Sequence, residues 1–292
     1  MSGIALLGAI EIGLLFGLVA LGVYLSFRIL QFPDLTVDGS FPLGAAVAAT
    51  LIVHRVDPWL ATAAAALAGA LAGLATAWLN LHLRILDLLA SILTMIALYS
   101  INLRIMGRPN VALLGEDTVL SALQDRAIPA YVLTPLAFAV AVFAIKWLLD
   151  RFLVSELGLA LRATGANPRM ARAQGIRTER AILLGMALSN ALVALAGALF
   201  AQSQGSADVT IGVGVIVVGL AAVIGGEALL NPRAVAWATT ACILGSLLYR
   251  LIVALALNAD FLGLQAQDLN LITAALVAVA LVLPRLRSGP AR

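Results

Sequence analysis

The chain has 292 residues, of which 62% are hydrophobic and only 11% are charged, and its mean hydropathy is +1.05. A soluble domain carries about 25% charged residues, so this composition excludes both a soluble globular protein and a disordered chain. The net charge is only +3, and in so apolar a chain the arginines are read first as determinants of membrane topology rather than of nucleic-acid binding. A polytopic membrane protein with an all-α helix bundle is therefore expected.

Nine segments are candidates for membrane-crossing helices, since a span needs about 20 mostly apolar residues. The first segment has no cleavage-site pattern, which indicates a retained helix rather than a signal peptide. In chain order the nine are 4–30, 41–57 (short), 59–81, 85–106, 131–150, 181–203, 208–229, 234–257 and 268–283 (short).

The orientation follows from the positive charges. Residues 151–180 form the longest polar stretch and contain six arginines, so the positive-inside rule places them in the cytoplasm. Counting spans outward puts the N-terminus outside and the C-terminus in the cytoplasm. Thirteen of the 18 Lys and Arg residues then lie on the cytoplasmic side, which supports this topology.

The stretch "FPDLTVDGSF" at 32–41 separates the first two predicted spans. Two aspartates and a proline interrupt almost continuous apolar sequence there. A solvated loop and a helix broken inside the membrane both fit this pattern. A second copy of the stretch, 174 positions later, favours the broken helix.

Residues around the stretch recur without a gap at this one offset, which predicts an internal repeat with halves of about 4–106 and 178–283. Five predicted spans separate the copies, so the copies run in opposite directions through the membrane. Inverted repeats are typical of transporters, whose pathway lies where interrupted helices meet. The matched pairs are "LVAL" at 18–21 and 192–195, Leu25 and Leu199, "DLTV" at 34–37 and "DVTI" at 208–211, and Pro58 and Pro232.

Polar side chains at the two breaks and on the sixth span are the candidates for the substrate pathway. We expect Asp34 and Thr36 to cap the half-helix that follows them, and the second copy to do the same. Asp38 has no counterpart in the repeat, where Gly212 stands, so it is the first candidate for a substrate contact. For Asn190, both an interhelical hydrogen bond and a substrate contact remain open. The predicted set is Asp34, Thr36, Asp38, Ser40, Asn190, Asp208 and Thr210.

The residues required for enzymatic chemistry are missing. A phosphate-binding loop needs Gly-x-x-x-x-Gly-Lys, and the only lysine, Lys146, lies in "AIKWLL". His54 and His82 show no metal-binding spacing, and Cys242 stands alone. The pair Gly69 and Gly73 has the spacing of close helix packing. The chain is therefore expected to bind no metal or cofactor and to catalyse no reaction itself.

The cytoplasmic stretch "VSELGLALRATGANPRMARAQGI" at 154–176 predicts two short helices joined by a turn. A basic amphipathic loop lying on anionic lipid would explain the arginines. It would not explain the caps or the small residues, which allow close approach by another protein, so we favour a docking surface. Its predicted residues are Ser155 as a cap, Glu156 in the first turn, Leu159, Arg162, Gly165 in a left-handed end, Asn167 as the second cap and Pro168 behind it.

Three stretches resemble the branched-chain amino acid permease family of ATP-binding-cassette (ABC) importers. They are "ELGLALRATGANPRMARAQGI", "EIGLLFGLVALGVYLSFRIL" and "LAAVIGGEALLNPRAVAWA". The first resembles the cytoplasmic coupling segment, the second the first helix and the third a late helix and turn. Sugar-transporting relatives have a "D-L-S-V-G-S" type of stretch where this chain has "DLTVDGS", so the pattern is nearest to a branch associated with amino-acid-like substrates, tryptophan or tyrosine among them.

The resemblance implies the membrane-spanning permease subunit of an importer in a bacterial inner membrane. It implies one permease domain, 1–292, with a cobalamin-importer-like (type II-like) fold. It also implies a second permease copy, two cytoplasmic ATPases that bind residues 151–180, and an extracytoplasmic substrate-binding protein. ATP and magnesium would then be bound by the ATPases. The alternative is a secondary transporter driven by an ion gradient, which also uses inverted repeats.

Overall fold

The computed structural model describes residues 3–121, 130–230, 232 and 234–257, most of them in helices. In chain order the elements are α1 (Gly3–Val23), the π-helix η1 (Tyr24–Ile29), α2 (Thr36–Val53), α3 (Pro58–Leu83), α4 (Asp87–Met106), β1 (Asn110–Ala112), α6 (Ala130–Val154), α7 (Glu156–Ala166), α8 (Pro168–Ala173), α9 (Thr178–Gln204), β2 (Ser206–Asp208), α10 (Val215–Leu230) and α11 (Val235–Leu257).

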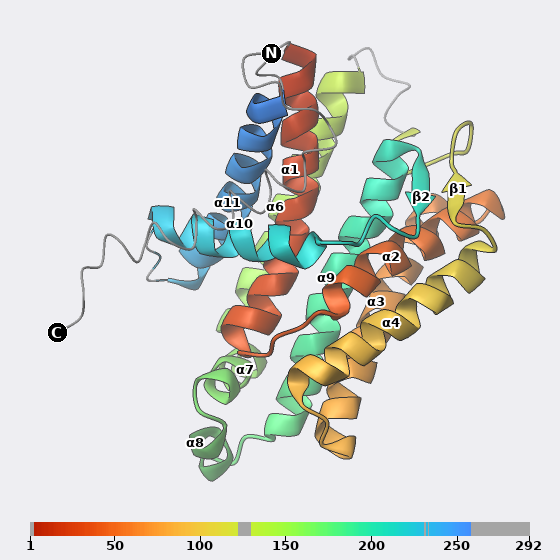
Figure 1. Ribbon diagram of the computed structural model, residues 1–292. Coiled ribbons are helices and arrows are strands. Elements are labelled where there is room, and N and C mark those ends of the chain that lie inside the picture. Colours follow the sequence, from red (N-terminus) through yellow and green to blue (C-terminus); the bar gives the residue numbers. More distant parts are fainter. Residues whose placement is uncertain (1–2, 122–129, 231, 233, 258–292) are drawn as a thin grey trace.

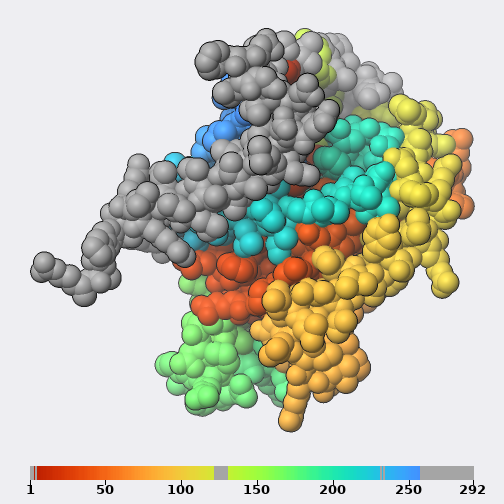
Figure 2. All heavy atoms as spheres, viewed as in Figure 1, coloured from red at the N-terminus to blue at the C-terminus, as the bar shows by residue number. Residues whose placement is uncertain are grey.

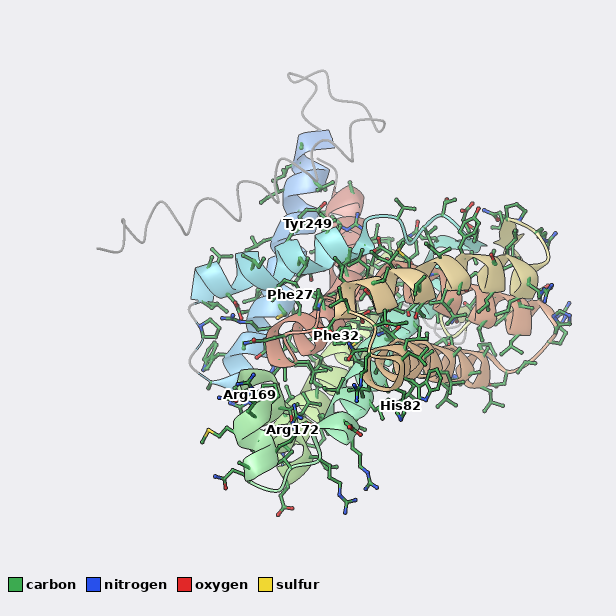
Figure 3. All side chains as sticks on the ribbon, turned by 60° about the horizontal axis from the view of Figure 1, so that its bottom comes forward. Phe27, Phe32, His82, Arg169, Arg172 and Tyr249 are labelled. Carbon is green, nitrogen blue, oxygen red and sulfur yellow. The ribbon has the colours of Figure 1, made fainter. Side chains whose placement is uncertain are left out.

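Seven helices in the described part of the chain are long and apolar enough to cross a membrane. The prediction of nine spans is not confirmed. The predicted span 268–283 lies outside the described residues. The predicted span 208–229 is wrong in extent, because β2 and a series of turns precede α10, which has only 16 residues. Figures 1 and 3 show α10 lying across the direction of α1 and α11 rather than along it.

The second predicted span also differs from the structure. It was expected at 41–57, but α2 begins five positions earlier, at Thr36, and ends at Val53. Asp57 then caps α3 by accepting hydrogen bonds from the amides of Trp59 and Leu60, with Pro58 at the first helical position. Most of the stretch "FPDLTVDGSF" therefore belongs to a buried helix and to the short turn that precedes it.

The residues of the predicted repeat fall in two sets of three helices, α1–α2–α3 and α9–α10–α11. Figure 1 shows α1 running away from the N-terminal end of the molecule and α9 running back towards it, so these two helices run in opposite directions, as an inverted repeat requires. Each set is interlocked with the other, because α1 packs against α11 while α9 packs against α3. The antiparallel pairing of β1 with β2 joins the ends of α4 and α9.

From Gly13 to Val23, helix α1 is apolar on all sides because it is buried on all sides. Leu15, Leu18 and Leu21 are fully buried within the main hydrophobic core. The helices α6, α9, α10 and α11 surround it. A helix that is apolar all round is typical of such a central position.

Glycines allow α9 to lie directly against the backbones of α2 and α3. A Cβ atom on Gly44 would lie 1.9 Å from the carbonyl oxygen of Ala194. On Gly69 and Gly73 it would lie 2.4 Å from the carbonyl oxygen of Asn190 and 2.1 Å from that of Met186. The prediction that Gly69 and Gly73 serve helix packing is confirmed.

We predict that Gly44→Ala destabilises the protein by about 1–3 kcal/mol, because overpacking of a tight contact separates α2 from α9. The matched control is Gly225→Ala in α10, where a Cβ would meet no atom within 4 Å. Alanine is the better helix former there, so the control should unfold at or above the wild-type temperature. Thermal unfolding in detergent measures both variants, and equal melting temperatures would contradict the packing argument.

Candidate functional site

The first break lies between η1 and α2 and is buried. The chain leaves η1 through Leu30 and Gln31, whose φ of 56° is left-handed, and the amide of Phe32 donates to the carbonyl of Ser26 at 2.8 Å. Asp34 is only 1% exposed, and its Oδ1 accepts a 3.0 Å hydrogen bond from the amide of Thr36. The stretch is therefore a broken helix inside the protein, and not a solvated loop.

A buried polar cluster surrounds this break. Asn190 on α9 donates from Nδ2 to Asp34 Oδ2 at 2.8 Å, and its Oδ1 accepts from the Ser40 hydroxyl at 2.7 Å. The Thr36 hydroxyl is 2.7 Å from the hydroxyl of Thr76 on α3. All five side chains are 0–1% exposed. The cluster thus joins the break to α2, α3 and α9.

Four of the seven predicted pathway residues meet in this cluster: Asp34, Thr36, Ser40 and Asn190. For Asn190 the structure supports the interhelical hydrogen bond. Thr76 was missed by the sequence analysis. It follows Gly69 and Gly73 at the i, i+4, i+7 spacing of one helix face, and that spacing was the signal available.

The second break repeats the local geometry of the first in a more exposed place. Asp208 Oδ1 accepts from the Thr210 amide at 2.7 Å and from the Thr210 hydroxyl at 2.6 Å. These hydrogen bonds hold the pKa of Asp208 below its usual range. Asp208 and Thr210 stay apart from the buried polar cluster. They also do not cap α10 as predicted, because α10 begins only at Val215.

Asp38 supplies the cap of α10 instead. Its Oδ1 accepts from the amide of Ile216 at 2.7 Å, and its Oδ2 accepts from the amide of Gly214 at 3.2 Å. A side chain of α2 therefore satisfies the first turn of a helix in the other half of the repeat. The sequence analysis singled out Asp38 only as a candidate for a substrate contact, which stays a prediction, and it missed this capping role.

Gly212, the repeat counterpart of Asp38, lies directly against it. A Cβ on Gly212 would be 2.0 Å from the Asp38 carbonyl oxygen and 2.6 Å from the Pro42 ring. Pro42 has no N–H to donate to that carbonyl, which is its i−4 partner in α2. Asp38 and the glycine that stands at its position in the second copy are thus in contact.

The segment 154–176 folds as two short helices, as predicted. Ser155 Oγ accepts from the Gly158 amide at 3.4 Å, and Asn167 Oδ1 accepts from the amides of Arg169 and Met170, each at 3.1 Å. Pro168 takes the first position of α8. Glu156, Leu159 and Arg162 are exposed on α7. Figure 3 shows Arg169 and Arg172 on α8, at the same end of the molecule.

Gly165 differs from its prediction. It was expected to end the first short helix in a left-handed conformation, but α7 continues through it to Ala166, and Gly165 is buried. A Cβ there would lie 1.8 Å from the carbonyl oxygen of Ile29. Gly165 therefore contacts the end of η1 in its own chain, immediately before the first break, and not an outer surface.

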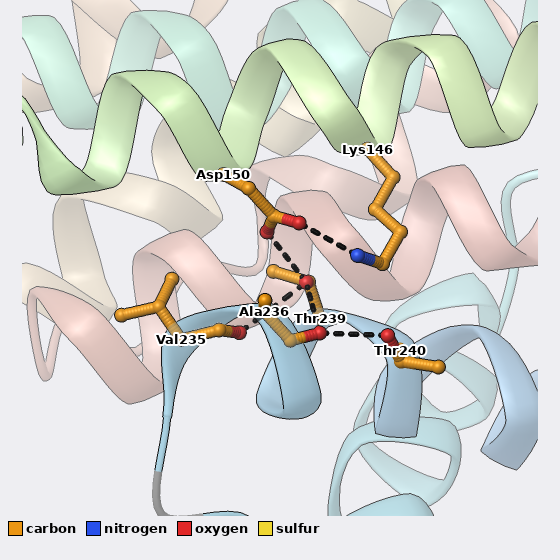
Figure 4. A network of polar contacts seen from close by, with 6 residues as sticks. All are labelled: Lys146, Asp150, Val235, Ala236, Thr239 and Thr240. Carbon is orange, nitrogen blue, oxygen red and sulfur yellow. Dashed lines mark hydrogen bonds and ion pairs between the residues drawn. The ribbon is translucent and has the colours of Figure 1, made fainter.

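A second polar network fixes the end of α6, which leads into α7 (Figure 4). Lys146 Nζ and Asp150 Oδ2 on α6 form an ion pair at 2.6 Å. The hydroxyl of Thr239 on α11 donates to Asp150 Oδ1 at 2.6 Å. The segment 154–176 is thereby held to η1 through Gly165 and, through Asp150 at the end of α6, to α11.

Comparisons with known proteins agree on one family. Residues 5–283 match the model of the branched-chain amino acid transport system / permease component. The tyrosine transport system permease protein of Clostridioides difficile is 38% identical over 278 residues, covering 95% of this chain and 90% of that protein. The probable branched-chain amino acid transport permease protein LivH of Methanocaldococcus jannaschii is 28% identical over 233 residues, covering 75% of this chain and 72% of that protein.

One solved structure is similar in fold. It is PsaBC from Streptococcus pneumoniae in complex with Fab, with a TM-score of 0.51 and 17% identity. The match covers 94% of this chain and 89% of that chain. At this identity the likeness concerns the fold alone.

Asn190→Leu should lower the free energy of unfolding by about 3 kcal/mol, because it leaves a carboxylate oxygen and a hydroxyl buried without partners. The matched control is Asn110→Leu, which removes the corresponding bond to Asp208 Oδ2 at the exposed second break and should change stability little. Chemical or thermal unfolding compares the two. Equal losses in both variants would show that burial of the cluster is unimportant.

Asp38→Ala should destabilise the protein by about 1–2 kcal/mol through loss of the α10 cap. Asp38→Asn should lose less, because its one amide oxygen can still accept from the Ile216 amide and only the Gly214 amide loses its partner. Melting temperatures in detergent test this, with limited proteolysis near Gly214 as a local measure. A wild-type melting temperature for the alanine variant would refute the capping role.

Proposed function

Because the chain belongs to the family of permease components of branched-chain amino acid transport systems, we propose that it is the membrane-spanning subunit of an ABC importer for an amino acid. The carrying observation is the interlocked inverted repeat with a break in each half. Two similar halves of opposite orientation can form a pathway that opens alternately to the two sides. The 38% identity to a tyrosine transport system permease favours an amino acid, tyrosine among them, as substrate.

We propose that α7 and α8 dock onto cytoplasmic ATPases. The docking proposal is supported by apolar side chains on the outer surface of these helices, beside exposed arginines. The apolar side chains are Leu157, Leu159 and Met170, which are 63%, 52% and 62% exposed. Apolar side chains with Arg neighbours are typical of protein interfaces. Under this proposal α7 and α8 lie in the cytoplasm, and the first turns of α1, which Figure 1 shows at the other end of the molecule, lie on the opposite side of a bacterial inner membrane.

The remaining parts of the importer are proposed on the same basis. A second permease copy completes the pathway, and a substrate-binding protein delivers the amino acid from outside. The inverted repeat supports a cobalamin-importer-like arrangement of the helices, with the pathway near Asp34, Asp38 and the turn 209–213. Hydrolysis of ATP, with its magnesium, takes place in the ATPases, which close and displace α7.

The decisive experiment is uptake by proteoliposomes that contain this chain, its co-purifying ATPase and the binding protein. We expect uptake of labelled tyrosine or another amino acid to require ATP on the side of the vesicle membrane that carries the ATPase. Uptake should persist when proton and sodium gradients are dissipated. Uptake that follows an ion gradient and ignores ATP would identify a secondary transporter instead.

The docking surface gives a further prediction. Replacement of Glu156 and Arg162 by alanine should weaken ATPase binding about tenfold or more, because truncation of an interface Arg commonly costs over 1 kcal/mol. Uptake per ATP hydrolysed should fall with it. The control is Arg104→Ala, an exposed arginine on α4 near β1. Normal binding and transport by the double variant would exclude α7 as the docking site.

A further inference from the structure

A pocket of about 400 Å³ lies between α2, α4 and the turn that leads to α10. This volume is within the roughly 300–1,000 Å³ range of small-molecule sites. Figure 2 shows α4 and the segment leading to α10 on the same face of the molecule, with part of α2 between them. We call it the α2–α4 pocket; Asp38, Asn102 and Thr210 are its polar lining residues used below.

The amide of Asn102 is buried and only half bonded. The residue is 0% exposed, and Nδ2 donates to the carbonyl of Gly39 at 3.2 Å. Its Oδ1 has no hydrogen-bond partner within the described part of the chain. Buried polar atoms are nearly always bonded, so this oxygen indicates a donor supplied by a ligand.

Two more acceptors line the same pocket. The Asp38 carboxylate has about four acceptor positions and uses two of them on the amides of Gly214 and Ile216. The Thr210 hydroxyl donates its one hydrogen to Asp208, so towards a ligand its oxygen can only accept. None of the described residues that line the pocket is Lys or Arg.

The rest of the lining is mostly apolar and includes Met95, Ile96 and Tyr99 from α4. A lipid chain would fit these walls but would leave Asn102 Oδ1 without a donor and the remaining acceptor positions of Asp38 and Thr210 unused, which is unfavourable inside a membrane. An ammonium group has three N–H donors and a positive charge that suits the Asp38 carboxylate. The pocket therefore matches an amine attached to an apolar or aromatic body.

We propose that the α2–α4 pocket binds a small molecule with a primary ammonium group on an apolar or aromatic body, with Asp38, Asn102 Oδ1 and Thr210 as its acceptors. The ligand class corresponds to the amino group and side chain of an amino acid, so this inference rests on the proposed function. Because Asp38 also caps α10, ligand binding and the position of α10 share one carboxylate.

Thiol labelling tests whether the pocket is wet and anionic. Ser100 lines the pocket on α4, and Ala97 on the same helix lines the neighbouring groove between α3 and α4, which is apolar apart from Thr94. The wild-type chain is a suitable background because its one cysteine, Cys242, is buried. Ser100→Cys and Ala97→Cys are therefore compared in lipid nanodiscs with a cationic aminoethyl and an anionic sulfonatoethyl methanethiosulfonate reagent.

We expect the cysteine at 100 to react with both reagents. The cationic reagent should label it about tenfold faster than the anionic one, because the nearby Asp38 carboxylate attracts it. The cysteine at 97 should react slowly with both, because a thiol among apolar groups stays protonated. Asp38→Asn should remove the charge preference. Should Ser100→Cys fail to fold, Ile96→Cys lines the same pocket and replaces it. Slow labelling at both pocket positions, or a preference unchanged by Asp38→Asn, would overturn the proposal.

Protection from labelling identifies the recognised group. L-tyrosine and tyramine, which share the amine, should protect the cysteine at 100, whereas 3-(4-hydroxyphenyl)propionate, which lacks it, should not. Asn102→Leu should raise the concentration of either amine that is needed for protection about tenfold or more, because the bond from the charged ammonium group to Asn102 Oδ1 is lost. Equal protection by the deaminated acid, or none by either amine, would refute the site.

These outcomes are separable from those of the transport assay. ATP-dependent uptake without any protection at position 100 would leave the proposed function intact and refute only this site. Protection by amines together with an absence of ATP-dependent uptake would retain the site and refute the proposed importer.

Discussion

The architecture depends on one constraint: amides and carbonyls freed where a helix breaks inside a membrane protein must still be bonded. Asp34 meets it at the first break by bonding the amide of Thr36, and Asp38 meets it at the start of α10. Both carboxylates lie within five positions of each other. This short segment therefore supports the break in its own half and the helix that follows the break in the other half.

The contact between Asp38 and Gly212 explains why one of these two positions has no side chain. With 2.0 Å between the Asp38 carbonyl oxygen and a Cβ placed on Gly212, position 212 cannot carry a side chain. The glycine at position 212 thus has a steric origin. Asp38 meets no such limit, and it places a carboxylate beside the α2–α4 pocket.

The sequence predicted features that depend on neighbouring residues or on periodicity, among them the Asp34 turn, the Asn167 cap and the packing role of Gly69 and Gly73. It could not predict contacts between helices far apart in the chain. The cap that Asp38 provides and the buried position of Gly165 are of this kind. The predicted length of α10 was wrong for another reason, since hydropathy alone does not distinguish a helix from an apolar turn.

The contact between Gly165 and Ile29 explains how a force on α7 would reach the pathway of the proposed importer. Without a Cβ, the backbone of α7 touches the backbone of η1, and such close-packed contacts transmit displacement because they can hardly be compressed. Ile29 is only five positions before Asp34. The π-helix between α1 and this contact is a form often found at functional sites, where it can absorb a change of register. A push on α7 would therefore act first on the break held by the Asp34 and Asn190 side chains, before it reaches the rest of α1.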